Sequence, residues 1–273
     1  MREPDRHREA LQIDHGAVSV ATYVDALRDP SWRVRRAALE RAPKFLTVPG
    51  FLDALIQGLA SEDNAGLRNA AGEALVRLGG AAVEALADAD SSGDADQRKF
   101  IVEALGLIGG DTAQQQLYRA LSDHDINVRT AAAEALGRIG GESVADALLE
   151  ILDRPDTDAQ SAAYLLDAVA ATGVRIAIAR LSEFMDQPVL ERSLYPVLGA
   201  SGDPAALPKL LHGLRHGSQG NRAAALVALA QLMEEADIEV EVGQSLSESP
   251  GVKGSLVQGL EHEQDEVVSA AAR

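Results

Sequence analysis

The sequence predicts an all-α protein, a solenoid of about seven to eight stacked two-helix repeats, and three observations lead to this prediction. First, the stretch Asn127–Gly141 places apolar residues at helical spacing, so that they form one face of an amphipathic helix. Second, two glycines end this stretch, and glycine readily adopts the left-handed backbone that closes a helix. Third, the same pattern returns about every 31 residues, which indicates an internal repeat.

Equivalent positions of the repeat can be followed along the chain, with Ala131 as the reference. They are separated by 29 to 33 residues, except for the last interval of 46 residues. These positions are Ala37, Ala70, Phe100, Ala131, Tyr164, Ser193, Ala224 and Ala270. A two-helix unit cannot bury its apolar stripe alone, so we expect neighbouring units to stack.

The elements are expected in a regular order after a polar leader at residues 1–16. A short helix covers residues 17–27, and a second begins after Ser31, a residue that favours the N-cap. From there each unit has a helix A, a polar turn, a helix B and a glycine stop. Helix A is clearest at Phe51–Ser61, Val144–Asp153 and Ala206–Arg215, and helix B at Leu67–Gly80 and Arg98–Gly110. Residues 17–273 are expected to form a single solenoid domain.

Two parts of the chain depart from this template. In the fifth and sixth repeats Ala162 and Glu191 stand where Arg129 stands in the template. Pro196 lies inside helix B of the sixth repeat, where it should kink or shorten the helix. Before the last repeat, residues 234–251 insert an acidic segment that we expect to be a mobile loop. The last repeat is incomplete, which predicts either a frayed terminus or a longer protein.

The composition excludes several classes of function. The 273 residues contain no cysteine, which excludes disulfides, thiolate nucleophiles and cysteine-bound zinc. The formal net charge of −17 repels phosphate backbones, so a basic protein or peptide is a better expected partner than nucleic acid. The sequence has neither a signal peptide nor a run of about 18 apolar residues, so we expect a cytoplasmic protein with no membrane partner.

The regular repeats share a turn of the form Asp-x5-Arg, followed by Ala-Ala-x-x-Ala-Leu-Gly-x-Ile-Gly. This string resembles HEAT repeats, in particular the short bacterial variety named after phycobilisome lyase subunits. The resemblance implies a right-handed solenoid and a non-enzymatic scaffold or adaptor that binds proteins. It leaves two alternatives open: a bilin-lyase-like subunit that attaches a chromophore to a phycobiliprotein-type substrate, and a regulatory domain of a longer multidomain protein.

Five acids occupy one position of helix B in successive repeats: Glu40, Glu73, Glu103, Glu134 and Asp167. They should form a row of carboxylates on the helix-B face, which is concave in HEAT stacks. One interpretation is a solvated surface with local ion pairs four residues apart, such as Arg36–Glu40 and Lys99–Glu103. The other is a groove for a basic peptide or a positively charged protein surface.

Arginines and acids at the turns recur with the same period, and we expect them to be structural. Each arginine lies just inside the start of helix B, where the helix dipole disfavours a positive charge, so it should bridge the turn acid of its own or a neighbouring repeat. This ladder comprises Asp29, Arg35, Glu62, Arg68, Arg98, Asp123 and Arg129.

The irregular fifth and sixth repeats carry large side chains. By helix register Leu166 and Tyr195 are expected on the exposed side beside the acidic row. The same register applies to Leu39, Val102 and Leu226. Exposed side chains of this kind could anchor a partner, since tyrosine is enriched at interfaces. The alternative is that they fill the core around a kinked unit.

No catalytic, cofactor or metal residues are predicted, and an enzyme is the less favoured interpretation. His212 and His216 share a helix face, but no third zinc ligand lies nearby in the sequence. Deoxyhypusine hydroxylase has similar repeats and binds iron through His-Glu pairs, and none of the corresponding positions here holds such a pair. The sequence also lacks a phosphate-binding glycine loop and a nucleophile elbow.

Overall fold

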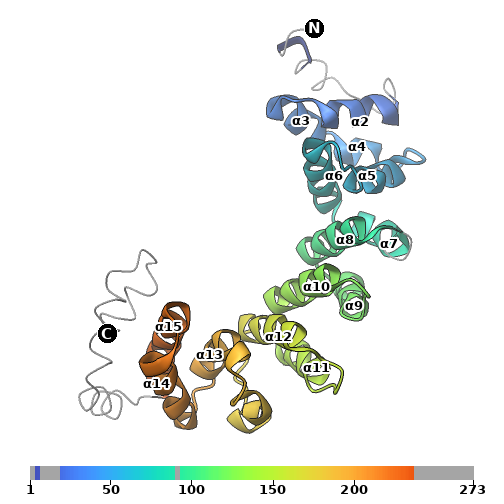
Figure 1. Cartoon of the computed structure of the whole chain (residues 1–273). Helices are drawn as coiled ribbons and strands as arrows, with labels where there is room; N and C mark the ends of the chain where they lie inside the picture. Colours follow the sequence, from blue (N-terminus) through green and yellow to red (C-terminus); the bar gives the residue numbers. More distant parts are fainter. Residues whose placement is uncertain (1–3, 7–18, 90–92, 237–273) are drawn as a thin grey trace. The chain divides into compact units, whose positions relative to one another are not determined.

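The structure is a computed structural model that describes residues 4–6, 19–89 and 93–236 (Figure 1). Within these residues the regular secondary structure is entirely helical. The predicted fold class, an all-α solenoid of two-helix repeats, is confirmed. The chain divides into two compact units, Met1–Leu136 and Gly137–Arg273.

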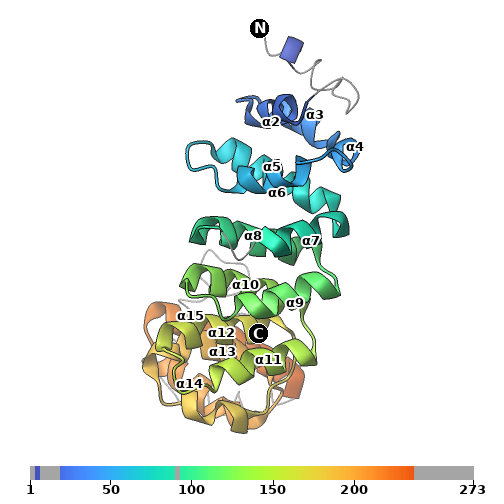
Figure 2. The same cartoon turned by 90° about the vertical axis from the view of Figure 1, so that its right-hand side faces the viewer.

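In the first unit, four helical hairpins follow one another as layers within the described residues (Figures 1 and 2). They are α2 (Val20–Arg28) with α3 (Trp32–Leu39), α5 (Phe51–Leu59) with α6 (Ala65–Leu78), α7 (Gly80–Ala89) with α8 (Ala95–Ile108), and α9 (Asp111–Ala120) with α10 (Ile126–Ile139). The last turn of α10 belongs to the second unit. The short helix α4 (Ala42–Phe45) lies between the first two hairpins in sequence. The first helix of each pair is helix A and the second is helix B, as predicted.

The second unit continues the pattern with three further hairpins among its described residues. They are α11 (Glu142–Leu152) with α12 (Ala159–Ala171), the 3-10 helices η1 (Ile178–Phe184) and η2 (Pro188–Leu190) with α13 (Glu191–Ala200), and η3 (Pro204–Ala206) and α14 (Leu207–His216) with α15 (Gln219–Ala236). Helix α15 includes residues 234–236, so the predicted acidic loop cannot begin before residue 237. The rest of that loop and the predicted eighth repeat lie outside the described residues, as does most of the leader. The single domain at 17–273 stays a prediction.

Capping side chains and glycines explain where the helices begin and end. The side chains of Asn64, Asp94 and Asp158 each accept the backbone N–H of the residue three positions later. Ser31 holds the predicted N-cap position of α3. The glycines that follow α6, α8 and α10 have positive φ angles between 60° and 73°, which a residue with a side chain rarely adopts.

The core of the repeats consists mainly of small and branched aliphatic side chains. In α6, for example, Ala71 and Leu75 are fully buried. Small residues allow neighbouring helices to approach closely. An aromatic cluster stands at the start of the first unit, where the ring centroids of Tyr23, Phe45 and Phe51 lie 4.9 to 5.4 Å apart.

Helix α13 shows the effect that was predicted for Pro196. It has 10 residues, whereas α6, α8 and α10 each have 14. A proline inside a helix removes one backbone hydrogen bond, which favours a shorter helix. The same helix packs very closely on α15 at Gly199. A Cβ at this position would lie only 2.7 Å from the carbonyl oxygen of Ala228.

Candidate functional site

The predicted row of acids lies on helix B of successive hairpins in the first unit. Glu40 directly follows α3, whereas Glu73, Glu103 and Glu134 lie within α6, α8 and α10. Glu40, Glu73 and Glu134 are exposed, and Glu103 is half-buried. The carboxylates of four hairpins are therefore accessible to a partner.

Three of these acids form ion pairs within or at the end of their own helix. The pairs join a basic nitrogen to a carboxylate oxygen: Arg36–Glu40 at 3.5 Å, Arg77–Glu73 at 3.5 Å and Lys99–Glu103 at 3.3 Å. The pairs at Glu40 and Glu103 confirm the prediction of local pairing. Exposed pairs of this kind stabilise a protein by only about 0.3–0.5 kcal/mol each, so a partner's cations can compete for the carboxylates.

Asp167, the fifth acid, occupies the same repeat position in α12 of the second unit. Its carboxylate lies at the surface and accepts a hydrogen bond from the Ser193 side chain of α13. The pKa of Asp167 is raised, because desolvation outweighs that hydrogen bond and the charge of Arg192, which both lower the pKa. Asp167 therefore joins two neighbouring repeats.

The arginines at the start of helix B hold the preceding turn chiefly through main-chain carbonyls. Arg35 Nη1 donates to the carbonyl oxygens of Asp29 at 2.7 Å and Pro30 at 3.0 Å. Arg129 Nη1 donates in the same way to the carbonyl oxygens of residues 123 and 124, at 2.8 and 3.2 Å. In these repeats the arginine therefore helps to hold the turn through main-chain carbonyls.

The prediction that Arg35 and Arg68 bridge a turn acid is wrong. Arg68 Nη1 donates to the carbonyl oxygen of Ser61 at 2.9 Å, while Glu62 is exposed. The guanidinium folds back over the start of the helix, where the carbonyls of the turn are within reach. The carboxylate of Asp29 is instead bound from upstream, by Arg6 Nε at 2.7 Å.

One arginine of the ladder does form the predicted ion pair with a neighbouring repeat. Arg98 Nε and Nη2 donate to the two carboxylate oxygens of Asp123, at 2.8 and 3.0 Å. The exposed fractions of the two side chains are only 9% and 13%. Desolvation alone would raise the pKa of Asp123, but the hydrogen bonds and charge of Arg98 outweigh it and lower that pKa. The pair ties α8 to the turn of the next hairpin.

The prediction that Leu166 and Tyr195 are exposed is wrong, because both side chains are fully buried. Leu39, Val102 and Leu226 are also buried, with at most 3% exposed. In a stack, helix B contacts its own helix A on one flank and neighbouring repeats on others, so the buried band is wider than that of an isolated hairpin. These five residues belong to the core.

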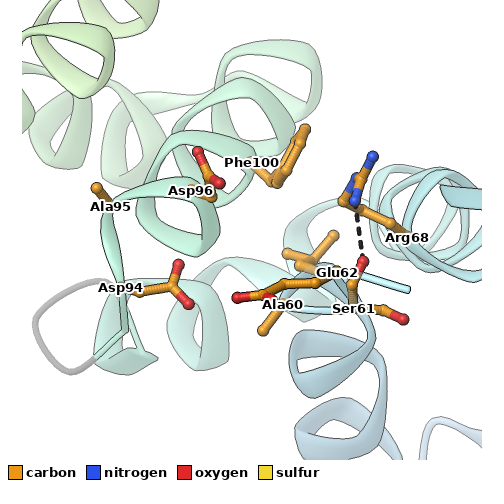
Figure 3. A pocket seen from close by; sticks show the side chains of 9 residues that line it. Ala60, Ser61, Glu62, Arg68, Asp94, Ala95, Asp96 and Phe100 are labelled. Atoms are coloured by element: carbon orange, nitrogen blue, oxygen red, sulfur yellow. Dashed lines mark hydrogen bonds between the residues drawn. The ribbon is translucent and has the colours of Figure 1, made fainter. Parts of the chain in front are cut away.

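Two adjoining hollows lie between the second and third hairpins, and the sequence motifs predicted no cavity there. The first, which we call the acidic hollow, has a volume of about 510 Å³. The acids Glu62, Asp94 and Asp96 line it together with Arg68 and Phe100 (Figure 3). Figure 3 shows that Glu62 and Asp94 point into this space from opposite walls.

The second hollow, which we call the apolar hollow, has a volume of about 340 Å³. Its apolar walls include Val76 of α6 and Leu107 of α8. Leu59, Arg68 and Phe100 line both hollows, so the two spaces meet at these side chains. Glu73 and Glu103 of the acidic row also line the apolar hollow, which places it on the same helix-B face.

Arg68 and Phe100 form the boundary between the two hollows. The guanidinium carbon of Arg68 lies 5.1 Å from the centroid of the Phe100 ring, a cation–π distance. Arg68 Nε is buried and has no hydrogen-bond partner. Phe100 stands where Ala37, Ala70 and Ala131 stand in the other repeats of the first unit, so its size is a sequence signal that could have located the hollows.

Other candidates from the sequence do not form a metal site. The His212 and His216 rings lie 4.8 Å apart between centroids, on the exposed side of α14. The described residues contain no group of three or more side chains placed to hold a metal ion. Nor does any described helix combine the length and apolar character needed to cross a lipid bilayer.

Comparison with known proteins identifies the repeats. Residues 81–167 match the family model described as HEAT repeats, which confirms the resemblance inferred from the sequence. No curated protein sequence matches the chain significantly.

The chain was also compared with solved structures. Kap121p bound to Pho4p aligns with a TM-score of 0.55 and 16% identity over 94% of this chain. The alignment covers 34% of Kap121p, so this chain spans about a third of its length. The complex of CpcE and CpcF of phycocyanin lyase from Nostoc sp. PCC7120 aligns with a TM-score of 0.43 and 23% identity, over 81% of this chain and 92% of that one. Human deoxyhypusine hydroxylase aligns with a TM-score of 0.32 and 20% identity, over 93% of each chain. At these identities the likeness concerns the fold.

Proposed function

We propose that the protein is a non-enzymatic scaffold whose helix-B face binds a basic protein or peptide. The observation that carries this proposal is the row of accessible carboxylates on four successive hairpins of the first unit, at Glu40, Glu73, Glu103 and Glu134. A repeated charge at a fixed helical position suits an extended partner that contacts several repeats at once.

The overall charge supports the same partner class. A formal net charge of −17 attracts basic partners and repels phosphate backbones. The local ion pairs along the row are exposed and weak, so they do not prevent a partner's lysines and arginines from reaching the carboxylates. A solved structure with this fold, Kap121p, holds another protein, Pho4p, so a stack of such repeats can serve as a binding surface.

The test is a binding titration of the full chain with a fluorescent lysine-rich peptide. We expect the affinity to fall as NaCl is raised from about 0.05 M to about 0.3 M, because salt screens exposed charges. Combined replacement Glu40→Gln, Glu73→Gln and Glu103→Gln should weaken binding at low salt. Fluorescence anisotropy measures both effects.

A matched control removes three exposed acids from helix A instead, with Asp53→Asn, Glu84→Gln and Asp88→Asn in α5 and α7. This variant has the same net charge as the helix-B variant. If the two variants lose the same affinity, the effect comes from total charge and the helix-B face has no special role. Binding that does not respond to salt would contradict the proposal altogether.

A further inference from the structure

We propose that the acidic and apolar hollows together bind a peptide segment that carries a large apolar side chain next to a basic one. This inference rests on the proposed function. It adds the place on the helix-B face where the peptide is anchored and the two kinds of side chain that it must present. We call the two hollows together the bipartite groove.

The apolar half of the groove exposes side chains that are usually buried. Leu107 has 65% of its surface exposed, although it is part of a regular helix B. Val76 and Phe100 are half-buried beside it. A hollow of about 340 Å³ with these walls can accept the side chain of a leucine, methionine or phenylalanine. Covering Leu107 would then stabilise the complex through the hydrophobic effect.

The charges around the groove favour a cation beside that apolar group. Glu62, Asp94 and Asp96 line the acidic hollow, and Glu73 and Glu103 line the apolar one. Among the lining residues the only basic side chain is Arg68, which is held by the carbonyl of Ser61 and the ring of Phe100. Arg77 and Lys99 pair with Glu73 and Glu103 at the edge of the apolar hollow, so the excess of negative charge is largest in the acidic hollow.

Arg68 does not convert the groove into an anion site. Its Nε atom is the group without a partner, but this atom is buried and a ligand oxygen cannot reach it without rearrangement of the walls. A carboxylate or phosphate would also meet the acids of the acidic hollow. The geometry thus favours a lysine or arginine of the partner over an acidic group.

Phe100 explains why the groove occurs at this place in the stack. The equivalent Ala37, Ala70 and Ala131 are buried, with at most 5% exposed, whereas Phe100 is only half-buried. Its ring lines both hollows and forms part of the wall between them. Since the apolar hollow and the acidic hollow share this wall, the apolar and basic side chains of the peptide must be close neighbours in its sequence.

The experiment uses the full chain and three fluorescent peptides of equal length. One contains lysines and a leucine, the second has the leucine replaced by serine, and the third has the lysines replaced by glutamine. The variant Leu107→Ala removes the most exposed wall of the apolar hollow and should not affect folding. Val189→Ala, at an apolar side chain that is 72% exposed in the second unit, is the matched control.

We expect the Lys/Leu peptide to bind at least about fivefold more tightly than the Lys/Ser peptide. Leu107→Ala should remove this advantage, and Val189→Ala should leave it unchanged. If both lysine peptides bind equally and Leu107→Ala has no effect, the groove is not the anchor site, while salt-dependent binding would still support the proposed function. If neither lysine peptide binds better than the glutamine peptide, the proposed function fails as well.

Discussion

In each unit a charged residue at the same position of helix B binds the next hairpin, but the charge is positive in the first unit and negative in the second. In the first unit, Arg98 of helix B reaches the turn acid Asp123 of the next hairpin. In the second, Glu191 stands at the arginine position of the template and accepts hydrogen bonds from Lys209 Nζ at 2.9 Å and Asn221 Nδ2 at 3.1 Å. The two hydrogen bonds of Glu191 connect α13 to the following hairpin. The missing arginine is therefore replaced by a contact of reversed polarity.

The electrostatics of the two contacts are alike despite the reversal. Desolvation alone would raise the pKa of Glu191, but the hydrogen bond and charge of Lys209 outweigh it and lower that pKa. Asp123 shows the same balance against Arg98. In both units a partly buried carboxylate is held in its charged form by a base of another hairpin, so Glu191 links two hairpins as Arg98 does.

Two large aromatic side chains of helix B, one in each unit, differ in their burial. Tyr195 of α13 is fully buried, and its hydroxyl group packs against Gly213 of α14, where a Cβ would clash with it. Phe100 of α8 remains half-buried and lines two open hollows. Tyr195 is thus part of the core, whereas Phe100 is part of a candidate binding surface.

The largest expected effect concerns Tyr195. Truncation by Tyr195→Ala should reduce the free energy of unfolding by about 3–5 kcal/mol, because a large buried side chain leaves a cavity in the core. Urea unfolding followed by circular dichroism measures this loss. Tyr195→Phe keeps the packing and should cost much less. A small loss for Tyr195→Ala would show that the side chain is at the surface, which would remove the contrast between the units.

Breaking the Arg98–Asp123 ion pair of the first unit should have the next largest effect on the free energy of unfolding. Arg98→Met removes the arginine that pairs with the mostly buried carboxylate of Asp123, which keeps the backbone N–H of Asp125, and should cost about 3 kcal/mol of unfolding free energy. Arg35→Met is the control, since Arg35 donates only to turn carbonyls, and should cost about 1 kcal/mol. Equal losses for the two variants would contradict the distinction between them.

The same pair predicts a pH dependence. The pKa of Asp123 is lowered in the folded protein, so its stabilising contribution is complete above the ordinary value of 3.8 and is lost as the pH falls below it. The stability difference between the native chain and Arg98→Met should therefore narrow in this acidic range. Unfolding curves at neutral pH and below that value measure the change, and a constant difference would argue against the ion pair.

The smallest expected effect concerns the basic residues that pair with the acidic row. Arg77→Met and Lys99→Met release Glu73 and Glu103, so the affinity for a basic peptide should rise by about two- to threefold. Arg28→Met, which removes an exposed base of helix A, is the control. Anisotropy titrations at low salt measure the change. A loss of affinity would mean that these bases, and not the acids, contact the partner.

Most of the stack was predictable because it depends on local patterns. Helical spacing of apolar residues, glycine stops and capping acids located the hairpins, and the bounds of α6 and α8 agree with the predicted Leu67–Gly80 and Arg98–Gly110 to within a few residues. The ion pairs at Glu40 and Glu103 were also predictable, since residues four apart on a helix are neighbours.

The sequence by itself determined the repeat, the all-α fold class and the position of the acids on helix B, because each depends on spacing along the chain. Only the tertiary structure decided that Leu166 and Tyr195 are core, that Arg35 and Arg68 bind turn carbonyls, and that Arg98 reaches an acid of the next hairpin. It also revealed the bipartite groove beside Phe100. These features depend on how far one hairpin lies from the next, and that distance is set by the packing of side chains from several repeats together.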